Sequence, residues 1–123
     1  MFIFYIGACI KDILLVVDMS YSIGKHSFVT NVKPFLKQLV KDTTLNVGPD
    51  GTQIAMIIFS HADKTKLLFN FGKNVDKEAL VNAFDEMEWA KISGGHTRTD
   101  IALKIANDEV RKDNKLFFHQ SII

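Results

Sequence analysis

One unbroken apolar segment, Ile13–Val17, most strongly constrains how this chain can fold. Successive apolar side chains that are rich in β-branched residues predict a strand buried on both faces of a sheet. Asp18, Ser20 and Ser22 follow directly, at alternate positions. We therefore expect a polar loop at the end of a central strand, where open α/β sheets place their ligands.

Two interpretations of this polar loop stay open from the residues alone. Asp18, Ser20 and Ser22 offer hard oxygen donors, the ligand type that Mg²⁺ prefers. Asp and Ser are also the commonest residues at helix N-caps, and the spacing by itself favours that structural role.

A second polar segment, Ser93–Asp100, favours the metal-binding interpretation over the helix cap. Gly94 and Gly95 allow either a positive φ or a close backbone approach, and Thr97 adds a further hydroxyl. The Asp-x-Ser-x-Ser and Gly-Gly-x-Thr-x-Thr patterns together resemble the von Willebrand factor A domain, also known as the inserted domain of integrins. The likeness covers roughly residues 11–115, and Gln53–Ser60 is similar to the second strand of that family.

This resemblance implies a Rossmann-like α/β fold, a doubly wound and mostly parallel sheet with helices on both faces. It also implies a metal site in which Ser20 and Ser22 bind Mg²⁺ or Mn²⁺ directly. Asp18 would bind directly or through water, and Thr97 would join in the high-affinity arrangement. In the family, an Asp or Glu of the partner protein takes the last coordination position.

Composition is consistent with one globular domain, residues 11–123, preceded by an apolar segment, residues 1–10. The chain has 123 residues, 47% of them hydrophobic, and a net charge of +1, so a nucleic-acid partner is not expected. Residues 1–10 are too short to span a membrane. They are interpreted as a signal remnant, an extra strand, surface-packed chain or disorder. Cys9 is the single cysteine of this sequence, so it is expected either as a buried free thiol or as half of a bridge to a cysteine outside it.

Alternating patterns predict the remaining elements. Strands are expected near residues 12–18, 52–59, 65–71 and 115–122, with the third at an antiparallel edge. Their expected spatial order is third, second, first, fourth. Helices are expected from Lys25 to Thr43 with an irregularity at Pro34, from Asp76, and from Thr99 as a cap.

The C-terminal segment departs from the family pattern. Family members continue into a strand that ends in an Asp, whereas Lys115–Ile123 contains no acidic residue. We therefore expect a domain that is incomplete at its C-terminus and binds its divalent ion weakly. Asp100 is a candidate replacement acid, although a carboxylate in a first helical turn ordinarily interacts with the helix dipole. His96 is expected as a solvent-facing loop residue, because imidazole suits softer ions than Mg²⁺. His26, His61 and His119 show no metal-binding spacing, and Trp89 is expected near a helix end.

Three functions follow from these alternatives. The expected one is a non-enzymatic adhesion or protein-interaction module that binds an exposed Asp or Glu of a matrix protein. The resemblance also implies an extracellular or secreted location. The second is a Mg²⁺-dependent phosphoryl-transfer enzyme that uses Asp18, although no phosphate-binding Gly-x-x-x-x-Gly-Lys segment is present. The third is a fragment of an adhesion protein that no longer binds.

Overall fold

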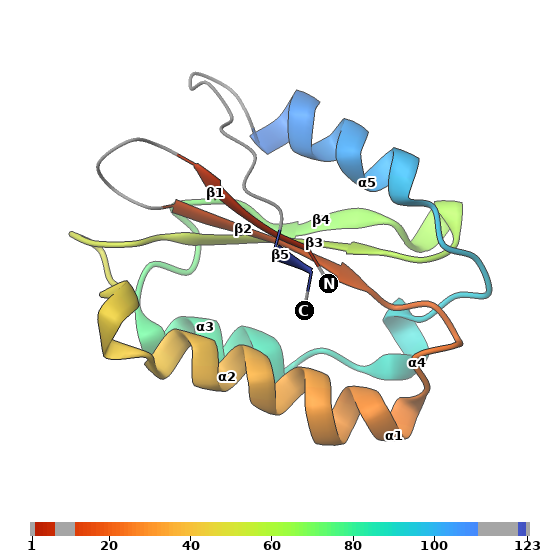
Figure 1. The fold of residues 1–123 in the computed structure, drawn as a ribbon, viewed down its shortest axis with the longest axis horizontal. Helices are drawn as coiled ribbons and strands as arrows, with labels where there is room; N and C mark the ends of the chain where they lie inside the picture. The colour runs from red at the N-terminus through yellow and green to blue at the C-terminus, as the bar shows by residue number, and fades with distance from the viewer. Residues whose placement is uncertain (1, 7–11, 111–120, 123) are drawn as a thin grey trace.

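The computed structural model describes residues 2–6, 12–110 and 121–122. Its strands and helices follow one another in short groups along the chain (Figure 1). The strands are β1 (Phe2–Ile6), β2 (Asp12–Asp18), β3 (Ile54–Phe59), β4 (Lys66–Phe69) and β5 (Ser121–Ile122). The α-helices are α1 (Lys25–Ser27), α2 (Lys33–Lys41), α3 (Lys77–Asp85), α4 (Trp89–Ile92) and α5 (Thr99–Ile105). Shorter turns are the π-helical η1 (Phe28–Val32) and η4 (Ala106–Val110) and the 3₁₀ turns η2 (Thr43–Leu45) and η3 (Ala62–Lys64).

The described strands form one mixed sheet in the order β4-β3-β2-β1-β5. β2 and β3 are parallel, with Ile13 opposite Ile54 and Asp18 opposite Phe59. The other pairs, β1–β2, β1–β5 and β3–β4, are antiparallel. The expected order of the strands near 65–71, 52–59 and 12–18 is confirmed, and so is the antiparallel edge strand.

The predicted neighbour on the other side of β2 is wrong. The segment near 115–122 was expected there, but β1 occupies that place, and β5 pairs with β1 instead. The physical reason is proximity along the chain, because segments separated by a short connection pair antiparallel at little entropic cost. Residues 111–120 lie outside the described residues, as does Cys9. The boundary between 1–10 and 11–123 stays a prediction.

Helices cover both faces of the sheet, as predicted (Figure 1). One core cluster joins Ile13, Leu15 and Val17 of β2 to the buried side chains of α2 and α3. The second cluster joins Leu14 and Val16 to Ala102 of α5 on the opposite face. Because successive side chains of a strand point to opposite faces, an all-apolar β2 supplies both clusters at once.

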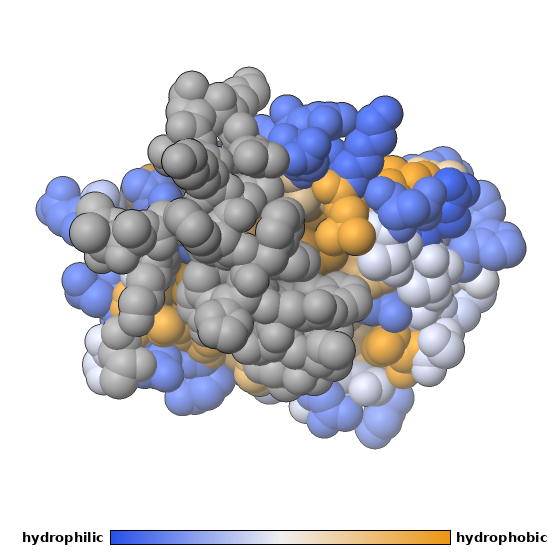
Figure 2. All heavy atoms as spheres, turned by 45° about the horizontal axis from the view of Figure 1, so that its top comes forward, coloured by the Kyte–Doolittle hydropathy of each residue, from blue (hydrophilic) through white to orange (hydrophobic). Residues whose placement is uncertain are grey.

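The α5 side carries a strongly hydrophilic outer surface with smaller hydrophobic patches beside it (Figure 2). Ala102 of α5 is fully buried, whereas Leu103, the next residue, is 43% exposed. The helix is therefore amphipathic and contributes only one narrow face to the core.

The first long helix follows its predicted range with one irregularity. α1, η1 and α2 run from Lys25 to Lys41, and the predicted disturbance near Pro34 is the π-helical stretch η1. Proline has no N–H and its ring crowds the carbonyl four residues earlier, which disfavours regular α-helical bonding there. The backbone N–H of Lys33 donates to the carbonyl of Phe28, five residues back.

The second predicted helix begins where expected. The Asp76 carboxylate accepts a hydrogen bond of 2.7 Å from the backbone N–H of Ala79, which caps α3. Leu80 and Phe84 then face the core. Trp89, expected at a helix end, opens α4 and packs its ring 5.4 Å from that of Phe28.

We expect Leu36→Ala to lower the free energy of unfolding by about 2–5 kcal/mol, because it leaves a cavity at a fully buried site. Leu103→Ala is the matched control, a helical leucine that is 43% exposed, and its effect should stay within about 0.5 kcal/mol. Urea unfolding followed by circular dichroism measures both. Equal losses in the two variants would contradict this assignment of the core.

Candidate metal centre

The loop after β2 gathers three oxygen-bearing side chains. The Asp18 carboxylate accepts a hydrogen bond of 2.8 Å from the backbone N–H of Ser20. The Ser20 and Ser22 hydroxyl oxygens are 3.0 Å apart. The backbone N–H of Ile23 donates to the Ser20 carbonyl at 3.0 Å, which tightens the turn. The alternate spacing read from the sequence therefore places Asp18, Ser20 and Ser22 in one compact loop.

The spacing of the two hydroxyls suits a hard octahedral ion. Adjacent ligands of Mg²⁺, each at 2.0–2.1 Å from the ion, lie about 2.9 Å from one another. The observed distance between Ser20 Oγ and Ser22 Oγ is close to that value. Ser20 is buried and Ser22 is exposed, so the pair leads from the interior to the solvent.

Gly94 ties the second polar loop to the first. Its carbonyl accepts a hydrogen bond of 2.8 Å from the N–H of Tyr21, and its N–H donates to the carbonyl of Met19 at 3.2 Å. These bonds form a short parallel bridge between Ser20 and Gly94. A side chain at Gly94 would place its Cβ only 2.7 Å from Ser60 Oγ. Of the two roles expected for this glycine, close backbone approach is therefore the one that applies.

Thr97 lies on the same loop, between two anchored positions. Gly94 is held by the β2 loop, and the backbone N–H of Arg98 donates to the carbonyl of Ser60 at 2.9 Å. The Thr97 side chain itself is exposed. The loop that carries Thr97 is thus fixed beside the ends of β2 and β3, while a role for Thr97 in metal binding stays a prediction.

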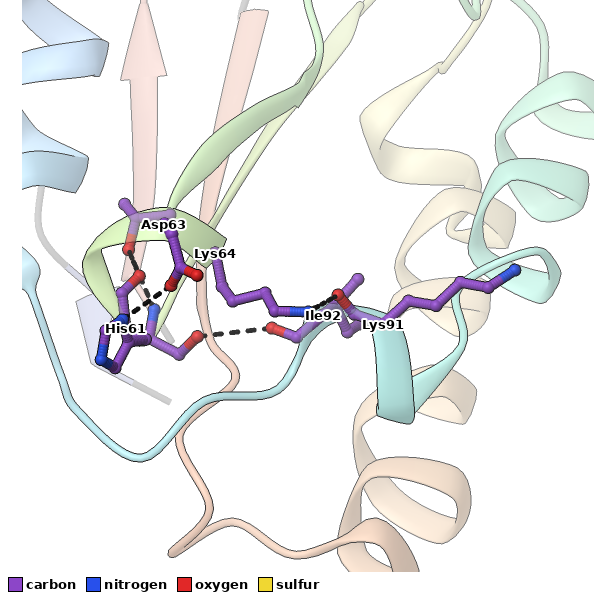
Figure 3. A network of polar contacts seen from close by, with 7 residues as sticks. His61, Asp63, Lys64, Lys91 and Ile92 are labelled. Carbon is purple, nitrogen blue, oxygen red and sulfur yellow. Dashed lines mark hydrogen bonds and ion pairs between the residues drawn. The ribbon is translucent and has the colours of Figure 1, made fainter.

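Ser60 is a positioning residue, a role that was not predicted from the sequence although Ser60 ends the Gln53–Ser60 pattern. It is fully buried at the end of β3, and its hydroxyl donates to the carbonyl of Ile92 at 3.3 Å. Lys64 also reaches α4, donating to the carbonyl of Lys91 at 2.9 Å (Figure 3). Both contacts fix the end of α4, from which the Gly94 loop departs. A serine directly after the apolar strand, matching the Phe-Ser at the end of the similar family strand, was the signal available in the sequence.

Asp100 is engaged elsewhere. Its carboxylate accepts two hydrogen bonds from the Arg98 guanidinium, at 3.0 and 2.8 Å. This hydrogen bonding, assisted by the positive charge of Arg98, lowers the pKa of Asp100 to about 2. The predicted cap at Thr99 is wrong, because Arg98 occupies the N-cap position of α5 and Thr99 is the first helical residue. The reason is that the Arg98 N–H bond to Ser60 fixes where the helix starts.

The histidines are less scattered than their spacing in the sequence indicates. The rings of His61 and His96 lie 4.8 Å apart, and His61 Nδ1 is 2.6 Å from Asp63 Oδ1. No group of three or more His, Cys, Asp or Glu side chains placed to hold a metal occurs in the described part of the chain. Within the same residues, no helix is long and apolar enough to cross a membrane.

An open α/β sheet with an oxygen-rich loop at its carboxyl edge defines a class of ligand-binding domain. Comparison with known proteins then gives the family. The model for the von Willebrand factor type A domain matches residues 12–116, so the chain belongs to this family.

Similar proteins include matrix and adhesion proteins. The human collagen alpha-5(VI) chain is 38% identical over 76 residues, which are 62% of this chain and 3% of that protein. Human matrilin-1 is 34% identical over 95 residues, 77% of this chain and 18% of that protein. Mouse integrin alpha-2 is 33% identical over 105 residues, 84% of this chain and 8% of that protein. The chain thus spans only a small part of each relative.

Solved structures show the same fold. Proximal thread matrix protein 1 from the mussel byssus superposes with a TM-score of 0.67 at 27% identity, over 84% of this chain and 25% of that one. A second structure of that protein, described as having a zinc-occupied MIDAS motif, gives a TM-score of 0.63 at 25% identity. It covers 94% of this chain and 30% of that one. A divalent ion therefore binds in a solved member of the fold.

We expect Gly94→Ala to lower the free energy of unfolding by about 1–3 kcal/mol, because its Cβ would overlap Ser60 Oγ and the His61 backbone. Gly95→Ala is the control, since its nearest neighbour, the Tyr21 ring, is at an ordinary contact distance of 3.5 Å. Chemical denaturation of both variants measures the difference. A Gly94 variant as stable as the Gly95 variant would show that the two loops do not pack this closely.

We expect Arg98→Ala to return the pKa of Asp100 from about 2 toward its ordinary 3.8. A depressed pKa in the folded state means that the pair stabilises the fold above pH 3.8, and that this contribution is lost as the pH falls toward 2. NMR titration of the carboxyl carbons follows the group directly, with Arg98→Lys as the charge-retaining control. An unchanged pKa in Arg98→Ala would exclude the ion pair as the cause.

Proposed function

We propose that this chain is a non-enzymatic protein-interaction module that captures an acidic side chain of an extracellular matrix protein through a divalent ion. The observation that carries the proposal is the compact oxygen cluster of Asp18, Ser20 and Ser22 at the carboxyl edge of the sheet. Ser20 and Ser22 would bind Mg²⁺ or Mn²⁺ directly, Asp18 would bind directly or through water, and Thr97 would complete the protein's share.

The chemistry of the donor set supports an adhesive role. A bound ion would act as a Lewis acid toward an incoming carboxylate. Serine and threonine hydroxyls are neutral, so Asp18 is the one anionic donor of the proposed set. Little of the ion's charge would be neutralised by the protein, which leaves it attractive to an Asp or Glu of the partner.

The similar proteins support the type of partner. Collagen chains, matrilin-1 and integrin alpha-2 are matrix and adhesion proteins, and each contains a region similar to this chain. A secreted or extracellular location and a matrix ligand are therefore proposed for this chain as well.

The same donor set predicts weak binding of the ion alone. A second carboxylate in the site would attract the ion further. At an effective dielectric of about 20, its Coulomb energy with a unit charge some 4 Å away is on the order of 4 kcal/mol. Asp100 does not supply it, because its carboxylate is bound to Arg98. We expect dissociation constants for Mg²⁺ in roughly the millimolar range, since Asp18 is the single carboxylate of the proposed donor set.

Calorimetric titration of Mg²⁺ and Mn²⁺ tests the site, and Asp18→Ala should abolish the binding heat. Asp50→Ala is the matched control, because Asp50 is exposed in the turn before β3, at the opposite end of that strand. Micromolar affinity that is lost in Asp18→Ala would show that another acid completes the site. Equal heats from Asp18→Ala and the unmodified chain would contradict the metal assignment.

Partner binding is tested with a peptide that contains one Glu, compared with the same peptide carrying Gln. In Mn²⁺ we expect at least tenfold tighter binding of the Glu peptide, and no difference in the presence of a chelator. Turnover of a generic phosphatase substrate in Mg²⁺ would instead favour the enzymatic alternative.

A further inference from the structure

A pair of histidines lies next to the oxygen cluster and is chemically unlike it. His61 follows β3, and His96 belongs to the Gly94 loop, yet their ring centroids are 4.8 Å apart with the planes tilted by 52°. Two features of the backbone hold them together. The Arg98 N–H donates to the Ser60 carbonyl, and Gly94 packs so closely that a Cβ there would be 2.7 Å from the Cβ of His61.

Asp63 sets the tautomer of His61. Its Oδ1 lies 2.6 Å from His61 Nδ1 (Figure 3), and a carboxylate can only accept hydrogen bonds. The proton of the neutral imidazole must therefore be on Nδ1, and Nε2, on the other side of the ring, carries the lone pair that could bind a metal. This carboxylate–histidine arrangement is typical of imidazoles that bind a metal, because it fixes the tautomer and the orientation of the ring.

We infer that His61 and His96 form a second site, for a transition ion such as Zn²⁺. Imidazole nitrogens prefer Zn²⁺, Cu²⁺ or Ni²⁺ over Mg²⁺. With Zn–N distances of 2.0–2.1 Å and tetrahedral geometry, the centroids of two bound rings lie about 5 Å apart. The observed 4.8 Å is close to this value. Water or a donor from a partner protein fills the other coordination positions, and Asp63 acts through His61 as a positioning residue.

The exposure of these side chains suits an accessible ion. The His61 side chain is 47% exposed, and the Asp63 side chain is 75% exposed. His96 is exposed as well. The two sites differ in their ligand atoms. The side chains of Asp18, Ser20 and Ser22 offer only oxygen, whereas the histidine pair offers only nitrogen.

Zn²⁺ titration of the whole chain in saturating Mg²⁺ tests this inference, with Mg²⁺ present to compete for the oxygen cluster. We expect one bound Zn²⁺, with its affinity lowered at least tenfold in His61→Asn and in His96→Asn. Asp63→Ala should lower the affinity by about 10-fold or more. His26→Asn, an exposed histidine on α1, is the matched control and should bind as the unmodified chain does.

Asp18→Ala distinguishes the two sites, because it should remove Mg²⁺ binding and leave Zn²⁺ binding in place. Long-range ¹H–¹⁵N spectra of the imidazoles give a second measurement, in which Zn²⁺ should shift Nε2 of His61 while Nδ1 keeps its proton. Zn²⁺ affinity that is unchanged in both His61→Asn and His96→Asn would overturn the inference. Loss of Zn²⁺ binding in Asp18→Ala would also overturn it, since the ion would then occupy the oxygen cluster.

Discussion

Burial of β2 on both faces is the constraint on which the rest of the structure depends. Its side chains alternate between the cluster beneath α2 and α3 and the cluster beneath α5, so neither layer can form without it. Its parallel pairing with β3 requires a crossover, which α1 and α2 supply. Both strands therefore end at the same edge of the sheet. Asp18, Ser20, Ser22 and His61 lie at or just beyond these strand ends, and the Gly94 loop with His96 and Thr97 is bridged to them.

Close packing of backbone, rather than contact between charged side chains, brings those loops together. Gly94 bridges to Ser20, and Arg98 bonds through its N–H to Ser60. Such contacts leave the loop little freedom to move, because each backbone amide has a single N–H that must point at its acceptor. Thr97 and His96 lie between the two anchors, so the same packing positions both the proposed oxygen site and the histidine pair.

Local chemistry explains what could be predicted from the sequence. The two-sided apolar run predicted β2, the Asp76 cap predicted the start of α3, and Pro34 predicted an irregular helix that the structure has as a π-helical stretch. Features that depend on contacts between distant segments could not be predicted. The Arg98 start of α5 and the meeting of His61 with His96 belong to this group. The place of β1 beside β2 instead follows from a short connection, but the apolar pattern of residues 1–10 did not distinguish a strand from the other possible roles of that segment.

Under the proposed function, the scarcity of negative charge at the oxygen cluster couples ion and partner. Asp18 would neutralise half of the charge of a divalent ion, and Asp100 would contribute none because Arg98 holds its carboxylate. A partner carboxylate would then supply the second negative charge, so that its binding strengthens the hold on the ion. By thermodynamic linkage, the ion must strengthen the binding of the partner by the same factor. The proposed site would thus bind the ion and the partner more strongly together than separately, since neither Asp18 nor one partner carboxylate alone would neutralise the charge of the ion.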